Sequence, residues 1–105
     1  MTTIKHGNHG FSMEFPNGYS LSVQYGYGNY SDNRDQCSFE MKGADVPKAS
    51  AVEVAIFAPD GAFVRLEDQN DVVGWLPVSA LPRFMLAVAD GDMSAAVEVV
   101  RDTGR

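Results

Sequence analysis

The sequence predicts an α+β fold: an antiparallel sheet of about five strands, built from two β-hairpins, with one or two C-terminal helices packed on one face. Apolar and polar residues alternate around a Pro-Asn-Gly turn at Pro16–Gly18 and again around a Pro-Asp-Gly turn at Pro59–Gly61, which is the period of a β-strand. Residues 77–103 instead repeat apolar side chains every three or four positions. That is the period of a helix, so strands come first and helices last.

The first hairpin is defined by its turn. Proline presets φ at the first turn position, and glycine accepts the positive φ that closes a three-residue loop. This loop length sets Phe11 opposite Val23 and Met13 opposite Leu21. We therefore expect one apolar face, directed to a core, and one polar face, directed to water.

The second hairpin joins residues 52–58 to residues 62–66. Phe57 and Phe63 face each other on its back, as two exposed aromatic side chains. Two explanations stay open: the segment Ser31–Ser50 folds over this pair, or the pair is an interface with a partner. One form of such an interface is a homodimer, in which two copies of the chain meet through the sheet face or through an edge strand.

The C-terminal part begins with a short fifth strand at residues 72–76. Ser79 is the expected N-cap of a first amphipathic helix, which Gly91 ends. Asp92 then caps a second helix, and Gly104 stops it.

The composition predicts one domain, residues 1–105, because its apolar content of 45% is enough to form a core.

The net charge is −6, and the eight lysines and arginines are scattered singly. Binding of nucleic acid or of an anionic membrane is therefore not expected, because it requires clustered cations. We expect neither a membrane span nor a secretory signal, because no stretch approaches ~18 apolar residues and the N-terminal residues lack a charged and then apolar run. The cytoplasm is the expected compartment.

Candidate catalytic or metal-binding residues are few. His6 and His9 form a His-x-x-His pair, and Cys37 is the single cysteine. Structural zinc takes four ligands, and a nucleophilic thiol needs an orienting base. Both histidines lie in a polar segment, residues 1–9, that we expect to be flexible. We therefore expect no enzyme activity, no metal and no cofactor.

One loop, residues 25–35, has the composition of a recognition surface. Three tyrosines and an arginine alternate with Gly, Asn, Ser and Asp, giving flat amphipathic contact area, a planar cation and adaptable hydrogen bonding. The candidate binding residues are Tyr27, Asn29, Tyr30, Asn33 and Arg34. The alternative is structural: the tyrosines pack over the sheet edge, and Asn33 with Arg34 caps a turn.

The segment from Asn17 to Tyr30, followed by Asn33-Arg34, resembles a group of small proteins encoded by bacteriophages and prophages. That group opens with an Asn-Gly hairpin, continues Ser-Val-Gln-aromatic-Gly and reaches a Gly-Asn-Tyr loop. The cysteine that often follows this loop in the group is Ser31 here, so no thiol role is implied. The resemblance implies a phage accessory or anti-defence context, and no activity.

These observations favour a non-enzymatic protein that binds and inhibits or modulates a host protein, with an anti-CRISPR-like inhibitor as the most concrete form. An alternative is a small-ligand module, oligomeric or not, that binds or sequesters a nucleotide by stacking on Tyr27 and Tyr30 with its phosphate on Arg34. Residues 1–52 carry a net charge of −1 and residues 53–105 a net charge of −5. Recognition by the loop and mimicry by acidic residues are therefore separate hypotheses.

Overall fold

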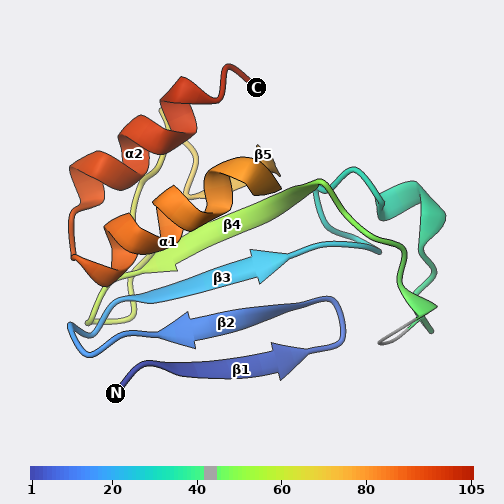
Figure 1. Ribbon diagram of the computed structural model, residues 1–105, viewed down its shortest axis with the longest axis horizontal. Coiled ribbons are helices and arrows are strands. Elements are labelled where there is room, and N and C mark those ends of the chain that lie inside the picture. The colour runs from blue at the N-terminus through green and yellow to red at the C-terminus, as the bar shows by residue number, and fades with distance from the viewer. Residues whose placement is uncertain (42–44) are drawn as a thin grey trace.

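The computed structural model describes residues 1–41 and 45–105. It confirms the predicted α+β class: a five-stranded antiparallel sheet is followed by two helices that pack against it (Figure 1). The strands lie in the sheet in their sequence order: β1 (Thr3–Gly7), β2 (Gly10–Glu14), β3 (Ser20–Gln24), β4 (Ala51–Phe57) and β5 (Val72–Pro77). The helical elements are η1 (Arg34–Gln36), η3 (Val78–Ala80), α1 (Leu81–Ala89) and α2 (Met93–Asp102).

The first hairpin has the predicted register. Phe11 pairs with Val23 and Met13 pairs with Leu21, and Gly18 has the expected positive φ of 90°. Leu21 and Val23 are buried in the core, while Phe11 and Met13 are partly buried against it. Turn chemistry alone was therefore enough to place this pair of strands.

The N-terminal residues belong to the sheet, whereas the sequence predicts a flexible segment at residues 1–9 and no strand. Thr3–Gly7 pair with β2 as the edge strand, with Ile4 opposite Met13 and His6 opposite Phe11. All five residues of β1 are exposed. The main chain of β2 supplies the hydrogen-bonding partners of this edge strand, so β1 needs no apolar face of its own. Its sequence therefore lacks the alternation of apolar and polar residues that would predict a strand.

The second hairpin forms only in part. The N–H of Ala58 donates to the carbonyl of Ala62 at 2.8 Å, and the N–H of Val64 donates to the carbonyl of Ile56 at 2.9 Å. Residues 62–66 nevertheless do not form a strand, contrary to the prediction. The same edge of β4 is shared: β5 pairs along residues 51–55, which leaves the hairpin only the last residues of β4.

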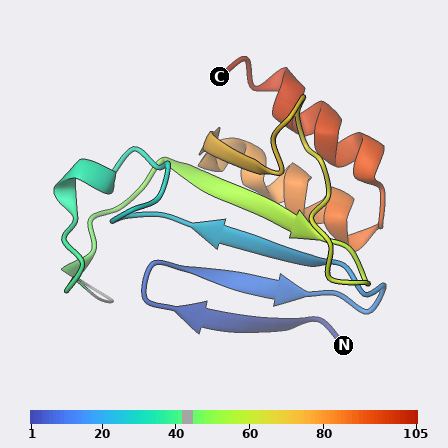
Figure 2. The same cartoon turned by 180° about the vertical axis from the view of Figure 1, so that it is seen from behind.

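The helices cover β3, β4 and β5, while β1 and β2 extend beyond them (Figures 1 and 2). Asp92 caps α2 as predicted, since its carboxylate accepts the N–H of Ala95 at 3.0 Å. Ser79 lies in η3 and does not cap α1, whose N-cap is Ala80. The largest fully buried side chains join both layers: Leu21, Ile56, Leu66, Leu76 and Phe84. Within residues 1–41 and 45–105, no helix has the length and apolar character needed to cross a membrane.

Candidate recognition surface

The loop that follows β3 is held by buried hydrogen bonds. The N–H of Gly26 donates to Ser31 Oγ and to Asn33 Oδ1, both at 2.8 Å. Asn33 Nδ2 in turn donates to the carbonyl of Pro47 at 2.7 Å. Ser31 and Asn33 are the two buried polar side chains among the described residues. Because buried polar groups without partners are costly, this network fixes the loop in one conformation.

Two of the predicted binding residues therefore hold the loop. Asn33 is 1% exposed, so its side chain lies inside the loop and is not presented at the surface. The half-buried amide of Asn29 donates to the carbonyls of Tyr25 and Tyr27 at 3.1 and 3.3 Å. The structural alternative has Asn33 with Arg34 cap a turn; Asn33 is the N-cap residue of η1, but its side chain makes no cap hydrogen bond there.

Asp32 attaches the loop to the start of β4. Its carboxylate accepts the N–H groups of Ser50 and Ala51 at 2.9 and 3.2 Å, and also the hydroxyl of Ser50. The bond from the Ser50 hydroxyl is the largest cause that lowers the pKa of Asp32, because it stabilises the charged form. Sequence analysis did not predict this contact, which joins residues 18 positions apart.

Tyr30 is held through its backbone and displays its ring. Its N–H donates to Glu53 Oε2 at 2.8 Å, and its carbonyl accepts the N–H of Trp75 at 2.9 Å. The side chain is 54% exposed. Its ring lies 6.3 Å from the Trp75 ring, between centroids, and Arg34 Cζ lies 5.1 Å from the Tyr30 centroid. We call Tyr30, Arg34 and Trp75 together the aromatic surface.

Trp75 occupies a strained position in β5. Its φ of 59° lies in the left-handed region, which L-residues other than glycine rarely adopt. Val52 pairs with Leu76 and Val54 with Val73, so the two residues Gly74 and Trp75 together oppose Glu53. This is a β-bulge, and a bulge re-aims the side chains around it.

Gly74 permits the close approach of the loop. A Cβ added there would lie 2.5 Å from the Cβ of Tyr30, a distance that side chains do not tolerate. The Trp75 side chain is 45% exposed, and sequence reasoning did not identify it as a binding residue. The available signal was a glycine inside a strand, which indicates a bulge or a close backbone contact.

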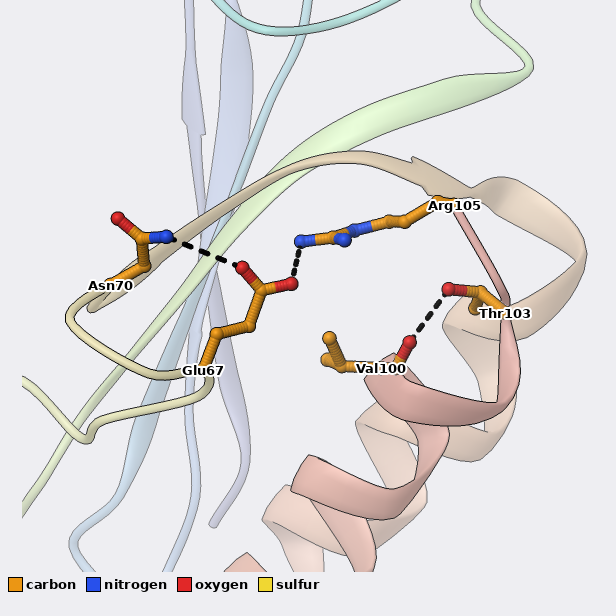
Figure 3. A network of polar contacts seen from close by, with 5 residues as sticks. All are labelled: Glu67, Asn70, Val100, Thr103 and Arg105. Atoms are coloured by element: carbon orange, nitrogen blue, oxygen red, sulfur yellow. Dashed lines mark hydrogen bonds and ion pairs between the residues drawn. The ribbon is translucent and has the colours of Figure 1, made fainter.

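A shallow hollow lies beside the aromatic surface. Its lining comes from the aromatic pair, from β5, from the preceding loop and from the last residue: Tyr30, Glu67, Asn70, Val72, Gly74, Trp75 and Arg105. Figure 3 shows one wall, where the Glu67 carboxylate accepts from the guanidinium of Arg105 and from the amide of Asn70. The same view shows the Thr103 hydroxyl donating to the carbonyl of Val100 at the end of α2, 2.7 Å away.

The other predicted aromatic residues lie elsewhere. Tyr27 contacts Phe39 edge to face, with centroids 5.9 Å apart, and both rings are largely exposed. Phe57 and Phe63 face each other as predicted, with centroids 4.6 Å apart. The segment Ser31–Ser50, of which residues 42–44 lie outside the described part, lies beyond the start of β4 (Figure 1). Phe57 ends that strand, so the expectation that this segment covers the pair is wrong for the described residues.

The histidines and the cysteine do not assemble a reactive centre. His6 is exposed on β1, whereas His9 Nδ1 is buried and has no hydrogen-bond partner among residues 1–41 and 45–105. A Cβ built on Gly26 would lie 3.7 Å from that nitrogen and 3.4 Å from Cys37 Sγ, so both side chains pack against the loop backbone. Among the residues that the structure describes, no three His, Cys, Asp or Glu side chains gather as a metal site requires.

The aromatic surface can thus bind by stacking, by cation–π contact and by hydrogen bonding at its rim. Its position is set by backbone contacts of Tyr30 and by the bulge at Trp75. Comparison with protein-family models, with curated proteins and with solved structures finds no match to the chain.

Proposed function

We propose that the chain is a non-enzymatic binding protein that contacts another protein through the aromatic surface. The observation that carries this proposal is Trp75, a large ring that a left-handed backbone holds half in solvent. Strained residues persist only where the surrounding structure imposes them, and they cluster at functional sites. Tryptophan, tyrosine and arginine are also the residue types that dominate binding energy at protein interfaces.

The rigidity of the surface supports the same proposal. Tyr30 is held through its N–H and its carbonyl, and Asp32, two positions later, is bonded to the start of β4. A surface that is ordered before binding loses less conformational entropy when a partner arrives. The rings therefore need no rearrangement to form a contact.

The resemblance to phage and prophage proteins suggests what the partner is. We propose a host protein, bound in the host cytoplasm and inhibited or modulated there, with an anti-CRISPR-like inhibitor as the most concrete form. Support comes from that resemblance and from the negative charge of the chain, −6, which disfavours binding to phosphate-rich ligands.

The test is a pull-down from host lysate followed by mass spectrometry, with the chain immobilised through its N-terminus. The captured protein is then purified, and its affinity is measured for the chain and for the variant Tyr30→Ala/Arg34→Ala/Trp75→Ala. Loss of a central aromatic contact costs about 2 kcal/mol or more, so we expect at least a ~30-fold weaker Kd. The matched control is Leu86→Ala, which removes an exposed apolar side chain from α1. An unchanged Kd for the triple variant contradicts the proposal.

The nucleotide-binding alternative has its own test. A nucleotide present at 100 times its Kd stabilises a protein by about 2.7 kcal/mol, which a thermal-shift assay detects. Stabilisation that Trp75→Ala abolishes would favour a small-ligand module over a protein-binding one.

A further inference from the structure

We infer that the partner presents a basic segment, with arginine foremost, to the aromatic surface. This inference rests on the proposed function and adds the chemistry of the partner. It depends on three features of the described residues: the charge around the surface, the exposed ring of Trp75, and a stacked arginine that the protein already contains.

The surroundings of the aromatic surface are acidic. The groups concerned lie within two residues of Tyr30 or Arg34 in sequence, contact Tyr30, line the hollow, or belong to residues 65–71, which precede β5. The carboxylates are Asp32, Asp35, Glu53, Glu67, Asp68 and Asp71, and the guanidinium groups are Arg34, Arg65 and Arg105. The resulting local charge of −3 is half of the net charge of the whole chain, −6.

Some of these carboxylates are already neutralised. Glu67 pairs with Arg105, and Asp71 pairs with Arg65 at 3.6 Å. Asp35 and Asp68 are exposed, and within the described part of the chain no cation lies at ion-pair distance from either of them. Among the described residues, these two carboxylates lie outside the ion pairs and can meet a cationic partner.

The protein itself shows how a guanidinium fits here. Arg34 lies over the Tyr30 ring at 5.1 Å, which uses one aromatic face, while the neighbouring residue Trp75 is 45% exposed. A guanidinium is planar and weakly hydrated, so it stacks on an indole at a lower desolvation cost than an ammonium group does. An acidic peptide or a phosphate chain would instead be repelled by the local charge of the surface.

The single tryptophan of the chain allows a direct test, because Trp75 is the only source of indole fluorescence. Collisional quenching by caesium and by iodide measures the sign of the potential at the ring. We expect the quenching constant for caesium, corrected for the intrinsic efficiencies of the two ions on free tryptophan, to exceed that for iodide. An equal or lower constant for caesium overturns the inference.

The second measurement uses defined peptides. Titration with nona-arginine at low salt is expected to change the Trp75 fluorescence with an affinity at least about tenfold above that of nona-glutamate. The double variant Asp35→Asn/Asp68→Asn should weaken nona-arginine binding about threefold or more, because it removes two exposed charges from the acidic surroundings of the aromatic surface. The matched control Glu14→Gln/Asp90→Asn removes two exposed charges from β2 and from the end of α1. Equal effects of the two double variants contradict the inference.

The outcomes separate this inference from the proposed function. If Trp75→Ala weakens binding of the purified partner while nona-arginine fails to bind, the partner is not basic, and the proposed function stands. If Trp75→Ala leaves partner binding unchanged, the aromatic surface is not the binding site, and both proposals fall.

Discussion

The backbone N–H of Trp75 donates to the carbonyl of Tyr30 at 2.9 Å, and the rings of the same two residues lie 6.3 Å apart. The loop that follows β3 is therefore joined to β5 by a main-chain bond and by an aromatic contact at one point. A substitution at either residue removes the aromatic contact, while the groups of the main-chain bond remain. This coupling makes the aromatic surface accessible to measurements of stability as well as of binding.

Replacing Trp75 separates backbone strain from side-chain packing. In a regular strand, glycine is less stable than alanine by roughly 0.5–1 kcal/mol. At the φ of 59° observed for Trp75 the order should reverse, because the left-handed conformation costs an L-residue about 1 kcal/mol or more. We expect Trp75→Gly to have a higher free energy of unfolding than Trp75→Ala, as measured by urea denaturation. The ordinary strand order would show that Trp75 is not held in the left-handed region.

Gly74→Ala should displace the loop. The added methyl group would lie 2.5 Å from the Cβ of Tyr30, and overpacking of this kind costs typically about 1–3 kcal/mol. Urea unfolding should show a destabilisation in this range. The second variant Gly74→Ala/Tyr30→Gly removes the colliding atom. Failure of this pair to recover part of the loss would contradict the contact.

Asn33→Ala should destabilise the loop more than Asn29→Ala does. The Asn33 amide bonds to Gly26 and Pro47 in a buried site, and removal of one partner of a buried hydrogen bond costs about 1–3 kcal/mol. The half-buried amide of Asn29 can be replaced by water, so its loss should cost about 1 kcal/mol or less. Chemical denaturation of both variants checks this order, and a larger loss for Asn29→Ala would refute the assignment.

Asp32 should make folding dependent on pH in the acid range. Its pKa in the folded protein lies below the ordinary value of 3.8, chiefly because the Ser50 hydroxyl donates to it. A lowered pKa gives stability that is present above the ordinary value and is lost as the pH falls through the folded value. The stability difference between the native chain and Asp32→Asn should therefore shrink below pH 3.8. A difference that is constant from about pH 6 to about pH 2 would exclude this contribution.

Sequence periodicity predicted most of the fold because its signals were local. The Pro16–Gly18 turn determined the register of β2 and β3, and Asp92 capped α2 as expected. The edge strand β1 was missed because all its residues are exposed, and so it has no apolar alternation to detect. The strand predicted at residues 62–66 failed because β5, a distant segment, pairs with most of the same edge of β4.

The candidate site was predicted only in part, for a related reason. Composition identified Tyr30 and Arg34, which do lie together, but it could not tell exposed from buried polar residues, and so included Asn33. Trp75 was not predicted as a binding residue, because its exposure depends on a β-bulge and the bulge depends on pairing with β4. Long-range pairing of this kind leaves little trace in the sequence beyond a glycine.

The bond between Arg105 and Glu67 has a practical consequence for how the protein is handled. Arg105 lines the hollow next to Trp75, so an affinity tag or a fluorophore fused after it would lie beside the surface under test. The two ends of the chain emerge on different sides of the molecule (Figure 1). Fusions joined before Met1 are therefore the ones that leave the aromatic rings open to a partner.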